Sequence, residues 1–329
     1  MSLILGIETS CDETGVALVR DGRLILANEV ASQIAVHAPF GGVVPEIASR
    51  QHIGCIAQLT ENAIQRSPGP VDAIAATCGP GLMGSLMVGV NFGKALAYAW
   101  VVPFIGVHHI EGHIFSVFLD VNGDGPPPEF PFLALVVSGG HTCLIQCSRP
   151  HSYEMLGTTR DDAVGECFDK VARLLGLSYP GGPSIQRAAE GGDPHAIPFP
   201  RAMAAESDSL EFSYSGLKTA ALYTLRDSNP PLADVAASFQ YAAVDALMIK
   251  TRRAIEMTGA RRLVLAGGVA ANRLLRERVV AELDVNVHMP SIDLCVDNGA
   301  MIAASAHSRL EHGLTSPLRT TPNPGLPLV

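Results

Sequence analysis

Two histidines one helical turn apart are the residues in this sequence best suited to chemistry. His109 and His113 lie in the segment VHHIEGH, which directly follows a predicted strand at 103–108. On a helix, residues four apart share a face with Cβ atoms about 5–6 Å apart, so both imidazoles can reach one metal ion. The alternative is a pair of surface or core histidines with ordinary hydrogen bonds. The spacing and the position after a strand favour a metal site.

Two histidines leave a metal site incomplete, and Asp297 in CVDNGAMIA is the candidate for the third ligand. It precedes a predicted helix, where a carboxylate also serves as a cap, and the sequence leaves both roles open. Zinc peptidases with the HExxH motif carry a general-base glutamate directly after the first histidine. Here Glu111 lies midway between the histidines and is expected to face away from the metal. Peptide hydrolysis is therefore not favoured.

Three glycine-bearing turns follow predicted strands, at residues 10–15 (SCDETG), 138–142 (SGGHT) and 266–273 (AGGVAANR). Backbone amides in such turns bind phosphate oxygens well, although a strand-to-helix turn also needs glycine for geometry alone. None matches GxGxxG or GxxxxGK[ST], which disfavours a Rossmann dehydrogenase and a P-loop kinase. Asp12 in the first turn is a candidate for positioning a substrate or accepting a proton, with turn capping as the alternative. Asp169 could accept a bond from a ribose hydroxyl or pair with Arg173.

The order of predicted elements repeats between the two halves of the chain. Strands are predicted at 3–9, 15–20, 23–30, 72–77 and 103–108, and again at 132–137, 141–147, 153–158, 263–265 and 285–289. Helices are predicted from 45 onward and at 85–100, 165–175, 233–258, 272–283 and 298–311. This pattern predicts an α/β protein of two similar lobes that face one another across a ligand cleft. Two unrelated α/β domains in tandem are the alternative.

The lobes are expected at residues 1–121, completed by about 297–329, and at 122–296, with the linker at 122–131 (GDGPPP). The 329 residues are 47% hydrophobic and carry a net charge of −9. A chain with this negative charge has no general electrostatic attraction for nucleic acid. Seven cysteines without CxxC spacing fit a reducing cytoplasm. The apolar stretch 82–107 contains Asn91, Lys94 and Pro103, which indicates a buried helix and strand and no membrane span.

Motifs spread over almost the whole chain resemble one family. They are IETSCDETG, GGVVPEIASRQH, CGPGLMGSLMVG, VHHIEGH, LVVSGGHT, GECFDKVARLLGLSYPGGP, FSYSGLKT, AGGVAANR and VDNGAMIA. Together they resemble the TsaD family of tRNA threonylcarbamoyladenosine synthases, once labelled O-sialoglycoprotein endopeptidases. The resemblance implies a duplicated actin/Hsp70-like ATPase fold of the ribonuclease H-like kind. It also implies transfer of a threonylcarbamoyl group from threonylcarbamoyl-AMP to the exocyclic amine of the adenosine 3′ of the anticodon, in tRNAs that read ANN codons.

The resemblance also assigns site residues. It implies metal ligation by His109, His113 and Asp297, with iron or zinc as the divalent metal, which would polarise the acyl group. It implies contacts to the adenine nucleotide at the following positions: Val136, Val137, Ser138, Gly139 and Gly140, together with Asp169, Gly182 and Asn272. Archaeal relatives have a tyrosine before the SGG turn that can approach the metal. This chain has Leu135 and Val136 in that strand, so a substrate oxygen or water is expected to take that place.

Partners implied by the resemblance are tRNA, a paralogue resembling the first lobe, and a small P-loop ATPase. Basic residues cluster at Lys250, Arg252, Arg253, Arg261, Arg262, Arg273, Arg276 and Arg278; solvated helix surfaces explain them slightly better than an RNA-binding site. Three other functions remain open at this point. They are a small-molecule kinase of the same superfamily, a metalloprotease, and a nucleotide-binding scaffold without catalysis.

Overall fold

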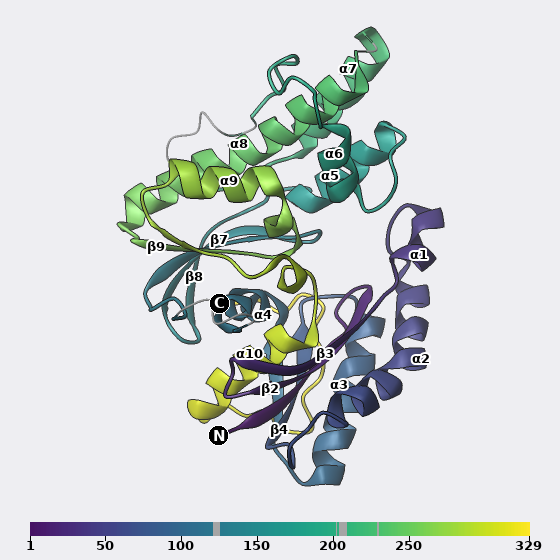
Figure 1. Ribbon diagram of the computed structural model, residues 1–329, viewed down its shortest axis with the longest axis vertical. Helices are drawn as coiled ribbons and strands as arrows, with labels where there is room; N and C mark the ends of the chain where they lie inside the picture. Colours follow the sequence, from purple (N-terminus) through teal and green to yellow (C-terminus); the bar gives the residue numbers. More distant parts are fainter. Residues whose placement is uncertain (121–125, 202, 204–208, 229) are drawn as a thin grey trace. The chain divides into compact units, whose positions relative to one another are not determined.

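The computed structural model describes residues 1–120, 126–201, 203, 209–228 and 230–329. The chain forms two compact units, of which unit 1 comprises Met1–Pro128 with Pro290–Val329 and unit 2 comprises Glu129–Met289 (Figure 1). Part of the predicted linker at 122–131, namely 122–125, lies outside the described residues. That the predicted lobes enclose a nucleotide stays a prediction.

Unit 1 is built on one five-stranded sheet in the order β3-β2-β1-β4-β5. Its strands are β1 (Leu3–Glu8), β2 (Glu13–Arg20), β3 (Leu24–Ser32), β4 (Ala73–Gly79) and β5 (Phe104–His108). Its helices are α1 (Ile34–His37), α2 (Pro45–Ile64), α3 (Met83–Trp100), α4 (His109–Phe115) and α10 (Gly299–Glu311), with short 3₁₀ turns η1 (Ala38–Phe40), η2 (Ser116–Phe118) and η4 (Ile292–Leu294). The first three strands are antiparallel, whereas β4 and β5 run parallel to β1.

The hairpin between β2 and β3 confirms the predicted Asp-Gly turn. Asp21 and Gly22 have φ angles of 52° and 66°, as a type I′ turn with both central residues left-handed requires, and Arg23 N donates to Arg20 O at 3.1 Å to close it. The alternating side chains of the sheet then divide into two cores. Helices α2 and α3 cover one face, where Leu5, Ile7 and Leu18 pack against Ile56 and Val90. Helix α10 covers the opposite face, so helices lie on both faces of this sheet.

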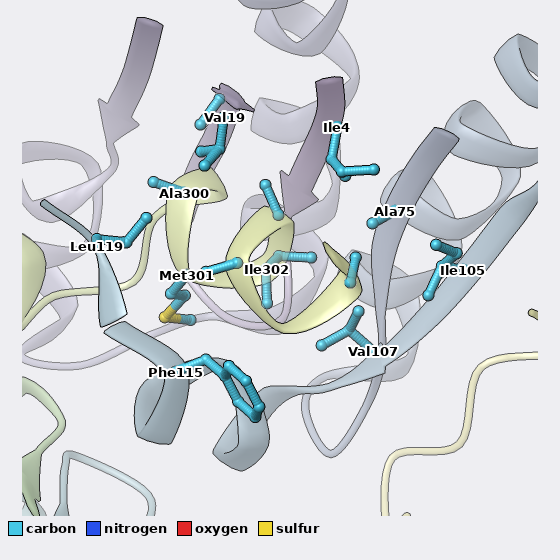
Figure 2. Close-up of a cluster of buried hydrophobic side chains, with 14 of the residues drawn as sticks. Ile4, Val19, Ala75, Ile105, Val107, Phe115, Leu119, Ala300, Met301 and Ile302 are labelled. Atoms are coloured by element: carbon cyan, nitrogen blue, oxygen red, sulfur yellow. The ribbon is translucent and has the colours of Figure 1, made fainter. Parts of the chain in front are cut away.

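Helix α10 lies on the opposite face, between the sheet and helix α4. Figure 2 shows Met301 and Ile302 of α10 among Ile4, Val107 and Phe115. This close packing needs glycine on both sides, because a Cβ built on Gly299 would lie 2.5 Å from the Ala17 nitrogen. The polar residues that precede α10 are thereby held beside the end of β1 and the start of α4.

Unit 2 repeats the sheet of unit 1. Its strands are β6 (Phe132–Val137), β7 (Thr142–Arg149), β8 (Ser152–Thr158), β9 (Arg262–Ala266) and β10 (Asn286–His288). Read from β8, their order is β8-β7-β6-β9-β10, again three antiparallel strands followed by two parallel ones. The duplicated α/β architecture predicted from the order of elements is confirmed.

The helices of unit 2 are α5 (Val164–Leu174), α6 (Gly181–Ala188), α7 (Ser215–Ser228), α8 (Leu232–Thr258) and α9 (Arg273–Glu282), with the 3₁₀ turn η3 (Gly268–Ala271). Helix α8 is long and apolar enough to cross a membrane by length and composition, but 67% of its apolar window is buried inside the protein. Phe239 of α8 packs edge-on against Phe168 of α5, with ring centroids 5.1 Å apart. Helix α8 is therefore the core helix of this unit.

Candidate functional site

The two histidines and the aspartate predicted to bind a metal converge in unit 1. Asp297 Oδ1 lies 3.6 Å from His109 Nε2 and 3.2 Å from His113 Nε2. The imidazole rings are 4.6 Å apart between centroids and nearly perpendicular. One ligand atom from each of the three side chains falls within 4.8 Å of the other two. Residues almost 190 positions apart in the sequence thus form one candidate three-ligand site.

Local capping explains why these side chains point inward. Strand β5 ends at His108, whose Nδ1 accepts a hydrogen bond from Ile110 N at 3.2 Å and so caps helix α4. Helix α10 is capped by Asn298, whose side chain accepts from Met301 N at 3.0 Å. The sequence left open whether Asp297 caps α10, and the structure shows that Asp297 does not. Its carboxylate, 18% exposed, is directed at the histidines instead.

The donor set fits a transition-metal ion. His113 is fully buried, and neither ring nitrogen makes a hydrogen bond of normal geometry among the described residues, although Nε2 lies 3.2 Å from Asp297 Oδ1. A buried imidazole normally satisfies at least one nitrogen, and a bound cation at Nε2 would satisfy it here. Two imidazoles and one carboxylate with open positions form a set typical of iron or zinc. The observation of the unsatisfied His113 ring therefore favours a metal at this place.

Sequence reasoning missed Glu8, the last residue of β1. This buried carboxylate accepts hydrogen bonds from Thr77 Oγ1 at 2.6 Å and from His109 Nδ1 at 3.2 Å, both at Oε2. Its Oε1 accepts from Ser10 N. Burial opposes protonation of His109, but Asp297 and Glu8 outweigh it and raise the pKa of His109 to about 9. A glutamate ending the apolar run LILGIE was the available signal.

The first turn, at residues 10–13, lies beside this site. Asp12 is largely buried, and its carbonyl accepts from Gln33 N at 3.2 Å. The carbonyl of Cys11 accepts from His52 Nε2 at 3.0 Å and from Ser85 Oγ at 3.3 Å. Burial, and next the Asp12 and Asp297 carboxylates, raise the pKa of Glu13 to about 9. Helices α2 and α3 therefore fix a turn crowded with carboxylates, which a cation would relieve.

Glu111, between the two histidines in the sequence, is bound to a neighbouring helix. It is fully buried, and its Oε2 accepts from Arg309 Nε of α10 at 2.7 Å. This hydrogen bond joins helices α4 and α10.

In unit 2, the SGG turn joins strand β6 to strand β7. Ser138 is buried, whereas Gly139 and Gly140 are exposed, and a Cβ on either would meet open space. Gly165 N in α5 donates to Ser138 O at 3.2 Å. Gly267, with φ +93°, packs so closely against Val137 that a Cβ would lie 2.4 Å from its carbonyl oxygen. Two of the three predicted glycine turns therefore meet, with exposed backbone amides at 139 and 140.

The other predicted nucleotide contacts also lie in unit 2. Asp169 Oδ1 accepts from Gly181 N at 2.6 Å, at the start of α6. Gly182 follows there and has open space beyond its Cα. Asn272 caps α9 by accepting from Leu275 N at 3.1 Å and donates to Gln240 Oε1 at 2.9 Å. Hydrogen bonds thus tie α5 to α6 and fix the start of α9.

A further link comes from Gln186 of α6, which sequence reasoning did not single out. Its Oε1 accepts from Arg273 N at 2.8 Å and so joins α6 to the start of α9.

Most of the basic residues on α8 and α9 have hydrogen-bond or ion-pair partners within unit 2. Lys250 donates to the carbonyl oxygens of Met203 and Ser209, and Arg278 pairs with Asp245 and Glu282. These partners favour a structural role for the basic cluster.

Comparison with known families decides what kind of protein carries this site. The profile of the TsaD family, described as tRNA N6-adenosine threonylcarbamoyltransferase, matches residues 24–304. The chain belongs to the TsaD family. This family is described as a transferase that modifies tRNA, and it is the family that the motifs resembled. The TsaD match covers elements from β3 to α10 and so includes the two histidines, the SGG turn and Asp297.

Solved structures of low sequence identity share the fold. Full-length HypF in a phosphate- and nucleotide-bound form is 15% identical with a TM-score of 0.64, covering 96% of this chain and 56% of that one. HypF from T. kodakarensis is 16% identical with a TM-score of 0.61, covering 94% and 48%. This TsaD chain thus spans about half the length of these proteins. Component A of (R)-2-hydroxyglutaryl-CoA dehydratase from Acidaminococcus fermentans is 13% identical with a TM-score of 0.55, covering 95% and 100%. The predicted actin/Hsp70-like ATPase fold is confirmed.

Proposed function

We propose that this TsaD chain transfers the threonylcarbamoyl group of threonylcarbamoyl-AMP to the exocyclic amine of the adenosine 3′ of the anticodon in ANN-decoding tRNAs, releasing AMP. One observation carries the proposal beyond family membership. His109, His113 and Asp297 converge, and the buried His113 ring makes no hydrogen bond of normal geometry among the described residues. A three-ligand site of this kind suits acyl transfer, in which charge develops on a carbonyl oxygen.

The three side chains would hold one divalent metal, iron by family resemblance or zinc. When bound, this metal would supply a Lewis acid that polarises the acyl group. His109 and His113 contribute neutral imidazole ligands, and Asp297 a carboxylate that reduces the net positive charge of the site. A partly exposed Asp297 beside two buried rings leaves room for a substrate on one side of the site.

The adenylate would bind to unit 2. Val136 and Val137 fix the end of a buried strand, so the exposed amides of Gly139 and Gly140 are presented to phosphate oxygens. Ser138 closes this turn through its bond to His141 N at 3.1 Å. Asp169, Gly182 and Asn272 would contact the nucleoside, with Gly182 leaving space that a side chain would fill.

The transfer step needs no covalent enzyme intermediate. The adenosine amine forms a bond to the carbamoyl carbon, the bond between that carbon and the phosphate oxygen of AMP breaks, and AMP leaves with the electron pair. Asp12 would accept the proton that the amine loses, or position the amine. Its fixed backbone, bound through Gln33 N, supports a positioning role.

Reconstitution tests the proposal directly. Threonine, bicarbonate, ATP, unmodified tRNA, a lobe-I-like paralogue and a small P-loop ATPase would be combined with and without this chain, in the cytoplasmic setting that we propose. Mass spectrometry of the nucleosides should show threonylcarbamoyladenosine only with the chain present. His109→Ala should abolish the product, whereas His312→Ala, at an exposed position, should not. Full product from the His109 variant would refute the metal assignment.

A further inference from the structure

The buried end of β1 contains a polar group outside the three proposed ligands. Glu8 has no exposed surface, and its carboxylate meets donors from three separate parts of unit 1. Ser10 N comes from the following turn, Thr77 Oγ1 from β4 and His109 Nδ1 from α4. A buried carboxylate is costly unless hydrogen bonds or a positive charge stabilise it, so its position in an otherwise apolar strand calls for a role.

The contacts define which nitrogen of His109 carries a proton. Both oxygens near Nδ1, Glu8 Oε2 and Ser10 Oγ, lie 3.2 Å away. A carboxylate oxygen can only accept, so Nδ1 must donate. The lone pair of the neutral ring then resides on Nε2, the atom that lies 3.6 Å from Asp297 Oδ1. The ring nitrogen that faces Asp297 is thus the one available to a metal ion.

We infer that Glu8 is a positioning residue that holds His109 in the Nδ1–H tautomer and orients its Nε2 toward the metal. The inference rests on the proposed metal site and deepens it. Carboxylate partners of this kind fix ring orientation and raise the basicity of the ligand, and their loss typically weakens metal affinity about 10–100-fold. Thr77 and Ser10 in turn hold the carboxylate in place, so the hydrogen bonds at the end of β1 together orient the His109 ring.

Replacing the carboxylate by an amide separates this role from simple packing. In Glu8→Gln, an amide oxygen facing His109 would turn the NH₂ group toward Ser10 N, placing two donors together. The reverse orientation would turn the NH₂ group toward Nδ1 and stabilise the Nε2–H tautomer, which blocks the ligand atom. Either arrangement disturbs the pair, although the side-chain volume barely changes.

The test measures metal affinity and tautomer separately. The wild type, Glu8→Gln and two controls would be stripped of metal, and Zn²⁺ affinity measured by competition with a chelator. Thr77→Val keeps the carboxylate but removes one of its donors, and Glu111→Gln removes a different buried carboxylate on α4. We expect a loss of about 10–100-fold for Glu8→Gln, a smaller loss for Thr77→Val, and a value near wild type for Glu111→Gln.

Nitrogen-15 shifts of the His109 ring in the wild type provide a readout that needs neither activity nor a variant that folds. Above about pH 9, where the metal-free ring is neutral, they should show a proton on Nδ1 and none on Nε2. Equal Zn²⁺ affinity of Glu8→Gln and wild type, or a wild-type ring protonated on Nε2 alone, would overturn the inference. Failure of the proposed function is distinguishable, because a wild type that binds no metal would still show the Nδ1–H ring.

Discussion

The buried ring of His108 makes the stability of unit 1 depend on pH in the acidic range. Its Nδ1 accepts from Ile110 N, and its Nε2 donates to Leu326 O at 3.0 Å, so the folded protein requires the neutral ring. Burial lowers the pKa of His108 from 6.5 to about 4, against the opposing effect of the Leu326 carbonyl. Between these pH values the unfolded chain binds a proton that the folded chain does not, so stability falls as the pH falls.

The magnitude follows from the two pKa values. One pKa unit corresponds to about 1.4 kcal/mol, so this single residue should remove about 3 kcal/mol between about pH 6.5 and pH 4. The contribution is fully present above pH 6.5. His109, whose pKa is raised to about 9, is protonated in the folded state throughout this window, so its slope is confined to the range near and above pH 6.5, where the unfolded chain loses that proton. The pKa of His52 is also lowered, so some acid dependence remains in any His108 variant.

His108→Asn isolates the effect. Asparagine keeps an oxygen that can cap α4 but does not titrate, so its stability deficit relative to wild type should shrink by about 3 kcal/mol on going from pH 7 to pH 4. Urea unfolding followed by the fluorescence of Trp100, the single tryptophan and part of unit 1, measures this in chelator-treated protein. His312→Gln, at an exposed site, should keep the wild-type slope. An unchanged slope in His108→Asn would refute the reasoning.

Two further substitutions probe the site and its support. Asp297→Asn should weaken Zn²⁺ binding about 10-fold or more with little loss of stability, because Asn298 provides the cap of α10; wild-type affinity by chelator competition would contradict this. Gly299→Ala should destabilise unit 1 by about 1–3 kcal/mol, since its Cβ would meet Ala17 N at 2.5 Å and Gly6 O at 2.7 Å. Urea unfolding indistinguishable from wild type would show that α10 can shift away from the sheet.

Local patterns predicted most of the fold. The Asp21-Gly22 turn and the strand 132–137 were correct because turn chemistry and apolar runs act over a few residues. Helices α6 and α7 were not predicted. Helix α6 begins with Gly181-Gly182, which signals a turn unless a tertiary contact such as the Asp169–Gly181 bond supports the helix.

The candidate site was only partly predictable. Spacing alone placed His109 and His113 on one face, since helical geometry is local. Whether Asp297 or Asn298 caps α10 depended on which side chain faces α4, a question of tertiary packing. Glu8 escaped notice because its partners, Thr77 and His109, are about 70 and 100 positions away in the sequence. Sequence periodicity carries no information about such contacts.

X-ray diffraction from crystals of the metal-loaded protein, at wavelengths on either side of the absorption edge of the bound metal, tests the central claim most directly. We expect an anomalous difference peak about 2 Å from Nε2 of His109, Nε2 of His113 and a carboxylate oxygen of Asp297. A fully loaded protein with its peak elsewhere, or with these three side chains directed away from it, would contradict the account.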